Sequence, residues 1–168
     1  MPVEKMPEGK FVELVDASDK VVGTAPRKLI HKKPLPHRAV HVWVFNALGE
    51  LFLQKRPSTM ELCPSMWDSS VGEHVEIGET YRQAAQRGLK EELHIRGTKP
   101  KRLSKKLVKH KNAHEMITLF ATTFGEKIKI NKKELAGGKF FSKAEIIELV
   151  KKKKTTPFFN VFFKKWFK

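Results

Sequence analysis

The sequence contains one cysteine, Cys63, and no long apolar run. A single cysteine excludes an intrachain disulfide, so we expect a reducing, cytoplasmic location. No stretch approaches the roughly 18 apolar residues that indicate a membrane-spanning helix. The first residues, Met-Pro-Val-Glu-Lys, also lack the apolar core of a secretory signal, and no internal repeat is present. These absences argue against secreted, membrane-embedded and repeat proteins, and they predict a soluble one.

Acidic residues are scarce in the last third of the chain. Residues 1–100 hold 15 Lys and Arg against 13 Asp and Glu, whereas residues 101–168 hold 19 against 5. Most of the net charge of +16 therefore lies after residue 100. Such a segment could bind RNA, DNA, a polyphosphate or an anionic membrane surface. The simpler interpretation is a solvated lysine-rich surface, because no aromatic-glycine nucleic-acid motif accompanies the lysines.

The length and the residue pattern predict one α+β domain. A chain of 168 residues can bury a full hydrophobic core. We assign residues 1–168 to a single domain, with a core at about 10–155 and a basic aromatic C-terminal helix at about 156–168. Alternating or β-branched apolar residues predict strands at 11–16, 21–24, 37–46, 51–56, 67–71, 102–108 and 116–124, with 127–130 as a further candidate.

The C-terminal part of the chain is predicted to be mostly helical. Gly137-Gly138 is interpreted as a turn, and Ser142 as the N-cap of a helix that ends near Lys152. A last helix is expected at 158–167, where aromatic residues recur at helical spacing. Such a stripe usually docks on the core, and membrane-surface binding is the minority interpretation.

The stretch from Gly72 to Ile95 reads as a glycine-containing loop followed by a helix. Three apolar positions of this helix fall on one inward-facing stripe: Ala85, Leu89 and Leu93. Gly88, Glu91 and Glu92 share another edge. Taken alone, the glutamate pair is more simply a solvated helix face. Adjacent carboxylates repel each other unless a cation lies between them, and hard oxygen ligands suit Mg²⁺ or Mn²⁺ that bridges a substrate phosphate.

The wider spacing resembles the Nudix box, the signature of the Nudix hydrolases. Six of its nine defined positions are filled, by Glu79, Arg87, Leu89, Glu91, Glu92 and Ile95. Three positions depart from it: Glu73 stands for the first glycine, Gly88 for the glutamate of the Arg-Glu pair, and His94 for the last glycine. The resemblance implies an α/β/α sandwich with a mixed sheet. It also implies Mg²⁺- or Mn²⁺-dependent hydrolysis of a nucleoside-diphosphate-linked or other diphosphate substrate.

The same resemblance implies roles for individual residues. Glu91 and Glu92 are expected to bind metal, and Glu79 to bind metal or brace the loop. Arg87, which in the family orients the missing glutamate, is expected to pair with Glu91 one turn on. Glu134 is the candidate general base, with a solvated turn residue as the alternative. The other candidates are Lys55 and Arg56 for phosphate, Trp67 either for stacking a base or for packing against the motif helix, and His41 and His94 as structural or surface residues.

Residues 35–79 also resemble the branch of isopentenyl-diphosphate isomerases and their hydrolase-like relatives. The resemblance rests on His37-Arg-Ala, Leu51-Phe-Leu-Gln-Lys-Arg56, Trp67, His74 and Gly78-Glu79, among others. His37 and His74 match two histidines of the isomerase metal site and are therefore further candidate ligands. Gly72 stands where the isomerase cysteine is expected, and Cys63 lies nine residues upstream. Isomerisation is therefore a minor alternative.

Gly88 leaves two main hypotheses open. One is a Nudix hydrolase that is weakened by the missing carboxylate, and the other is a Nudix-fold binding module for RNA or another polyanion. If the rest of the site is intact, Gly88→Glu is expected to raise the rate of hydrolysis by about 10²-fold or more.

Overall fold

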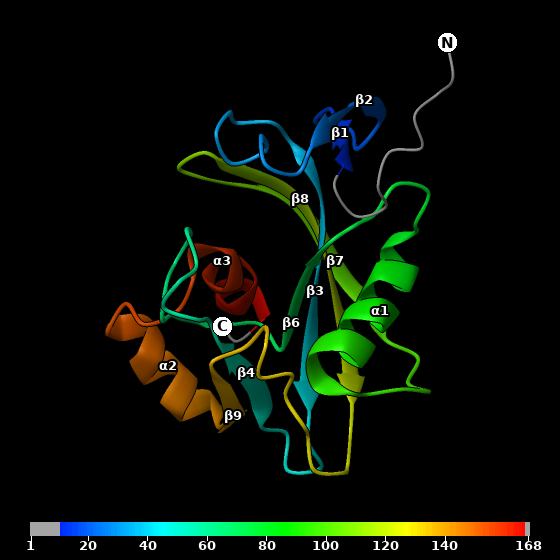
Figure 1. The fold of residues 1–168 in the computed structure, drawn as a ribbon. Helices are drawn as coiled ribbons and strands as arrows, with labels where there is room; N and C mark the ends of the chain where they lie inside the picture. The colour runs from blue at the N-terminus through cyan, green and yellow to red at the C-terminus, as the bar shows by residue number, and fades with distance from the viewer. Residues whose placement is uncertain (1–10, 167–168) are drawn as a thin grey trace.

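The computed structural model of the chain describes residues 11–166. Within this range nine strands form one sheet and three helices pack against it (Figure 1). The strands are β1 (Phe11–Val15), β2 (Val21–Pro26), β3 (His37–Phe45), β4 (Leu51–Lys55), β5 (Trp67–Asp68), β6 (Val71–His74), β7 (Lys101–His110), β8 (Ala113–Thr123) and β9 (Gly137–Phe141). The helices are α1 (Tyr81–Leu93), α2 (Lys143–Lys151) and α3 (Pro157–Trp166).

Strand β3 lies at the centre of the sheet. It runs parallel to β8, from His37 opposite Glu115 to Phe45 opposite Thr123, and antiparallel to β1, β4 and β6. Most of its residues are buried, as its near-continuous run of apolar and aromatic side chains predicts. The sheet is therefore mixed, and its centre brings together residues that are far apart in the sequence.

The two faces of the sheet carry different helices. Val40, Val42 and Val44 of β3 pack in a cluster with α1, whereas Trp43 packs with α2 and α3 on the other face. Figure 1 shows α1 on one side of the sheet and α2 and α3 on the other. Successive side chains of a strand point to opposite faces, so β3 supplies both cores. The predicted α+β architecture, a mixed sheet between helices, is confirmed.

The predicted strand at 127–130 is wrong. The neighbouring Asn131 ties this segment to the end of α1, because its backbone N donates to the carbonyl oxygen of Glu92 at 2.8 Å. Its side-chain amide also donates to the carbonyl oxygen of Glu91 at 3.2 Å. Ile128 and Ile130 pack against the α1 core. The segment thus follows the helix and brings residue 134 near it.

The predicted turn at Gly137-Gly138 is also wrong. Both glycines belong to β9, which pairs antiparallel with β4 and places Gly138 opposite Gln54. A β-carbon at Gly138 would overlap the ring of Phe52. Glycine is needed here because the ring lies directly against the strand backbone.

Helix α3 docks on the core as predicted. Phe158, Phe159, Phe162 and Phe163 are buried, whereas Trp166 is 44% exposed. The predicted helix position Phe167 lies outside the described residues, as do the first ten residues and the last one of the predicted domain. Within residues 11–166, no helix has the length and apolar character required to cross a bilayer.

His94 is the C-cap of helix α1, and it adopts the left-handed conformation with φ 55° and ψ 27°. Glycine adopts this conformation without the steric cost that a β-carbon brings. A His94→Gly protein should therefore gain about 1 kcal/mol of unfolding free energy, measured by urea unfolding. His94→Ala is the matched control, because it removes the imidazole but keeps the β-carbon, and it should show no such gain. Equal effects of the two substitutions would contradict this explanation.

Candidate metal and substrate site

The start of α1 is fixed by a capping box. The hydroxyl oxygen of Thr80 accepts a hydrogen bond from the backbone N of Gln83 at 3.2 Å, and the Gln83 side chain accepts one from Thr80 N at 2.9 Å. The predicted inward stripe is buried, and it consists of Ala85, Leu89 and Leu93. Cap and stripe together set which side chains of α1 face the sheet.

Arg87 ties the loop before α1 to the helix. Its Nε donates to Glu79 Oε1 at 2.8 Å, and its Nη2 donates to the carbonyl oxygen of His74 at 2.8 Å. Its Nη1 donates to Glu91 Oε2 at 3.4 Å, which confirms the expected pairing one turn on. Glu79 also accepts from the backbone N of Glu76, so it braces the loop. A part for Glu79 or Glu91 in metal binding stays a prediction.

Glu91 and Glu92 do not point the same way. The Glu92 side chain is buried, with the residue only 3% exposed, whereas the Glu91 side chain is 45% exposed. The carboxylates near Glu92 come instead from elsewhere in the chain. Carboxylate oxygens of Glu73 on β6, Glu92 on α1 and Glu134 after β8 lie within 4.8 Å of one another. We call these three residues the acidic group.

The surroundings of the acidic group disfavour the ionised forms of its carboxyl groups in the absence of a cation. Gln54 Nε2 donates to Glu92 Oε1 at 3.1 Å, but the buried Glu92 Oε2 has no hydrogen-bond partner. Burial raises the pKa of Glu92 well above its ordinary value, and nearby Glu73 raises it further. Burial likewise raises the pKa of Glu73 to about 7, although Arg87 opposes this shift. A cation between these carboxylates would remove the repulsion and supply the missing partner.

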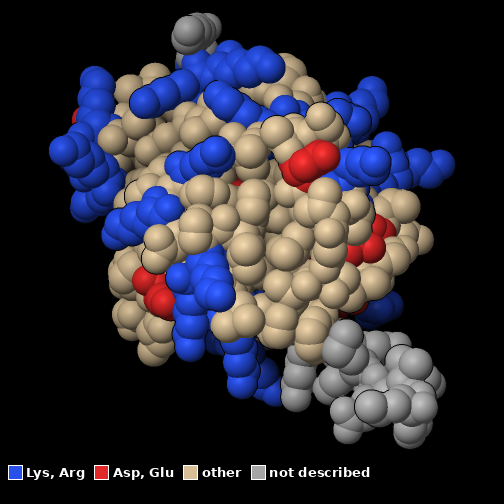
Figure 2. Space-filling view, turned by 90° about the horizontal axis from the view of Figure 1, so that it is seen from above, with Lys and Arg blue, Asp and Glu red and all other residues tan. Residues whose placement is uncertain are grey.

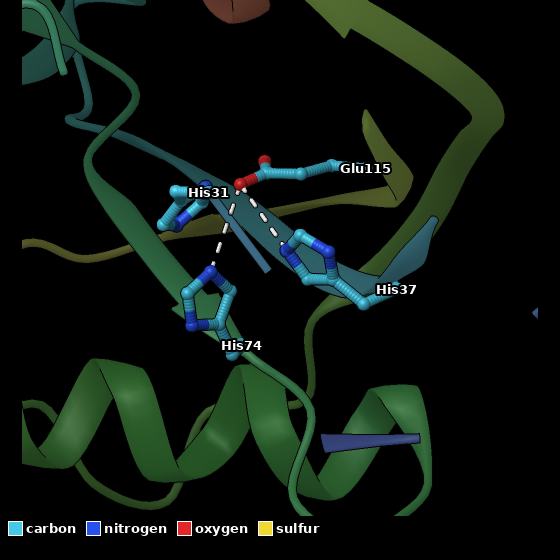
Figure 3. Close-up of side chains that lie close together, drawn as sticks. All are labelled: His31, His37, His74 and Glu115. Atoms are coloured by element: carbon cyan, nitrogen blue, oxygen red, sulfur yellow. Dashed lines mark ion pairs between the residues drawn. The ribbon is translucent and has the colours of Figure 1, made fainter. Parts of the chain in front are cut away.

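A second group of ligand-type side chains lies at the opposite face of β6. His31, His37, His74 and Glu115 bring ligand atoms within 4.8 Å of one another, and we call them the histidine group. Figure 3 shows the three rings turned toward the glutamate. The Nε2 atoms of His37 and His74 each lie 3.6 Å from Glu115 Oε1. The structure thus joins the two predicted histidines to two residues that sequence reasoning missed.

The orientation and the pKa values of the histidine group suit the binding of a metal ion. His37 Nδ1 lies 2.8 Å from the carbonyl oxygen of Leu35, which leaves its Nε2 as the ring nitrogen that faces the group. Burial lowers the pKa of His74 to about 4 and also lowers the pKa of His31. Burial alone would raise the pKa of Glu115, but contacts with His37 and His74 outweigh it and hold that pKa well below its usual range. Imidazole nitrogens and a carboxylate oxygen gathered in one place are ligand atoms that a divalent metal ion accepts.

A cavity of about 140 Å³ is lined by His31, His74 and Glu115 of the histidine group and by Glu73 of the acidic group. A larger apolar pocket of about 530 Å³ shares Arg27, Arg56 and His31 with it. Arg27 and Arg56 therefore line an apolar pocket together with the candidate ligands His31 and His74. This combination suits an anionic phosphate group attached to a less polar group.

The predicted phosphate-binding residues fall in different places. Arg56 lines both cavities, donates to the carbonyl oxygen of Leu62 at 2.9 Å, and lies 3.6 Å from Asp68. Lys55 instead lies over the ring of Trp67, 4.9 Å from its centroid. The phosphate-binding roles of both residues stay predictions.

Trp67 does not pack against the motif helix, so that alternative is wrong. Its ring contacts Phe141 at a centroid distance of 4.8 Å, in the core with α2 and α3. The reason is the alternation of strand side chains, which turns Trp67 to the face opposite α1. The other interpretation, stacking on a base, stays a prediction.

Gly72, which stands where the isomerase cysteine is expected, lies beside a histidine. A β-carbon at Gly72 would lie 3.7 Å from His41 Nε2. His41 is buried, and its Nδ1 lies 2.8 Å from Ser69 Oγ, which agrees with the predicted structural role. Cys63 packs against the core, and burial raises the pKa of its thiol. A thiol with a raised pKa is a weak nucleophile and a weak base at neutral pH.

The basic side chains spread over the surface. Figure 2 shows Lys and Arg around much of one face, with uncharged surface and a few acidic residues between them. Lys105 forms an ion pair with Asp19. Binding of RNA or DNA by this surface stays a prediction.

Comparison with known proteins agrees with these features. The family model for the NUDIX domain matches residues 35–164, so the protein belongs to the Nudix family. It is 40% identical over 91 residues to the uncharacterized Nudix hydrolase all7351 of Nostoc sp., covering 54% of each chain. It is also 38% identical over 84 residues to isopentenyl-diphosphate Delta-isomerase 2 of Photorhabdus laumondii, covering 50% of this chain and 48% of that one. The chain thus spans about half the length of the curated relatives it matches.

Solved structures share the fold. The crystal structure of DR0079 from Deinococcus radiodurans matches with a TM-score of 0.76 and 22% identity, over 87% of this chain and 91% of that one. The NUDIX domain of Shewanella oneidensis NrtR, solved with ADP ribose, matches with a TM-score of 0.55 and 13% identity, over 66% of this chain and 75% of that one. At these identities the likeness concerns the fold alone.

Proposed function

We propose that the protein is a divalent-metal-dependent hydrolase of a small molecule that contains a diphosphate. Membership of the Nudix family supports a hydrolase in general. The observation that carries the proposal is the unpartnered Glu92 Oε2, which is buried near the carboxylates of Glu73 and Glu134. Glu73 also lines the cavity that Arg27 and Arg56 line. A cation site next to a cationic pocket is what binding and cleaving a diphosphate requires.

The donor set of the acidic group fits Mg²⁺ or Mn²⁺, because it consists of carboxylate oxygens. When bound, such an ion would offset the charge on phosphate oxygens and lower the pKa of its water. Glu73 and Glu92 are the residues that would hold it. Gln54 orients Glu92 through the bond to Oε1.

The protein side chains divide the rest of the reaction. Arg56 and Arg27 would bind phosphate oxygens from the cavity wall. A water oxygen adds to phosphorus, the P–O bond of the diphosphate bridge breaks, and the water proton passes to a carboxylate. Glu134 is the proposed acceptor, since it is exposed to solvent and lies in the acidic group. The products are two phosphate compounds.

The isomerase alternative lacks a residue for its key step, because Gly72 cannot donate or accept a proton. The binding-module alternative rested on a missing carboxylate, whereas the structure assembles three carboxylates at the site. Neither alternative is therefore favoured over hydrolysis.

A substrate panel tests this function. Dinucleoside polyphosphates, nucleotide sugars, capped RNA and non-nucleoside diphosphates are incubated with the protein and Mg²⁺ or Mn²⁺, and phosphate products are quantified. We expect metal-dependent cleavage of at least one class, abolished by EDTA. Absence of cleavage across the panel, with a folded protein and either metal, would contradict the proposal.

A further inference from the structure

The space beside Gly88 is already filled by another carboxylate side chain. A β-carbon at Gly88 would lie 2.5 Å from Val71 Cγ1 and 2.9 Å from Glu73 Cγ. Separations under 3 Å require the neighbours to move. The gain of activity expected for Gly88→Glu stays a prediction, and the structure argues against it because the new side chain would compete with Glu73 for the same space.

The Glu73 carboxylate lies next to the residues that surround position 88 of α1. Its carboxylate lies in the acidic group with Glu92 and Glu134. It also lies 3.5 Å from Arg87 Nη1, the guanidinium that neighbours position 88 in the helix. The Glu73 side chain is only 14% exposed, so it is held in this place.

The strand geometry explains why residue 73 can do this. Side chains of β6 alternate, so Val71 and Glu73 face α1 while Gly72 and His74 face the histidine group. β6 also packs directly against α1. A glutamate at position 73 therefore points at the helix surface that Gly88 leaves open.

An independent observation shows that this space needs a ligand. Glu92 Oε2 is buried without a hydrogen-bond partner, and it lies 3.5 Å from the β-carbon position of Gly88. A buried carboxylate oxygen without a partner is costly unless a cation lies beside it.

We propose that Glu73 supplies from strand β6 the metal-binding carboxylate that position 88 of α1 lacks. A divalent cation is then held between strand and helix, by Glu73 on one side and Glu92 on the other. Two of the departures from the Nudix box are thus linked, because the glutamate at position 73 compensates for the carboxylate missing at position 88. This inference rests on the proposed metal-dependent function, but it concerns which residue binds the ion.

The test measures Mg²⁺ affinity of the purified metal-free protein by calorimetry, because imidazole ligands favour transition metals over Mg²⁺. Glu73→Gln keeps the shape of the side chain and removes its charge. We expect it to weaken Mg²⁺ binding at least about tenfold to a hundredfold, the loss that even an outer partner of a metal site causes. Gly88→Glu alone should not bind Mg²⁺ more tightly, because of the overlap.

A relocation variant provides the second arm. Glu73→Gly with Gly88→Glu and Val71→Ala moves the carboxylate to the helix and clears the space for it. We expect Mg²⁺ affinity to return to within about tenfold of the original protein. If this variant does not fold, judged by circular dichroism, the Glu73→Gln result alone decides.

The outcomes separate this inference from the proposed function. Unchanged Mg²⁺ affinity in Glu73→Gln would overturn the inference even if the substrate panel reveals hydrolysis. Weakened affinity in Glu73→Gln would support it even if the panel reveals no hydrolysis, in which case only the proposed function fails.

Discussion

A Glu92→Gln protein is expected to fold normally, to lose hydrolysis by about 10²-fold to 10³-fold, and to bind Mg²⁺ at least about tenfold more weakly. Glu92 is the most buried member of the acidic group, and its Oε2 has no partner in the protein. An amide of the same shape carries no charge to offset a cation or the charge that develops on phosphate. The measurements are calorimetric titration with Mg²⁺ and the rate on the substrate found by the panel.

The unfolding free energy of Glu92→Gln distinguishes the loss of a metal ligand from the loss of the fold. The pKa of Glu92 is raised in the folded protein, so the unfolding free energy of the metal-free protein falls as the pH rises from the ordinary glutamate pKa to the raised one, and the loss is complete above it. Glutamine is never ionised, so metal-free Glu92→Gln should be at least as stable as the original protein at pH 8. A lower urea midpoint for the variant would show that the substitution destabilises the fold, and the loss of activity could then not be assigned to a missing ligand alone.

Two matched variants complete the comparison. Glu126→Gln removes the same charge from an exposed residue, and it should change neither Mg²⁺ affinity nor rate beyond about twofold. Glu91→Gln removes the neighbouring carboxylate, which is largely exposed and contacts Arg87. We expect its effect to lie between those of the other two. An effect of Glu91→Gln larger than that of Glu92→Gln would reverse the assignment of the principal ligand.

Zn²⁺ is expected to raise the melting temperature of the metal-free protein by about 5–10 °C through the histidine group. A ligand at about 100 times its Kd adds about 2.7 kcal/mol to the unfolding free energy. For a chain of this size, each kcal/mol raises Tm by about 2–4 °C. Imidazole nitrogens suit Zn²⁺, and three of them face Glu115. Differential scanning fluorimetry with and without Zn²⁺ measures the shift.

Removing one ligand shows whether the histidine group causes this shift. His74→Ala should lose most of it, because His74 is a half-buried member of the group whose Nε2 faces Glu115. His94→Ala removes an exposed histidine at the end of α1 and should keep the full shift. Equal Zn²⁺ stabilisation in the two variants would place the binding elsewhere. A retained response in His94→Ala with none in His74→Ala would support the group.

The amino-acid sequence determined the main features of the motif helix. The loop-helix pattern and the spacing of Glu79, Arg87 and Glu92 predicted the family and the fold. The 3.6-residue period predicted the buried stripe, and the pairing of Arg87 with Glu91 followed from helical geometry. These predictions succeeded because they concern residues within one short loop-helix segment of the chain.

Only the tertiary structure decided which distant residues meet. His37 and Glu115 are neighbours because β3 and β8 pair in parallel, and Glu134 approaches Glu92 because Asn131 ties its segment to α1. Periodicity states which face of an element is buried, but it does not state which elements pair or in what register. Glu73 is the clearest case. In the sequence it is a departure from a glycine position, and its side chain lies against Gly88 only because β6 packs on α1.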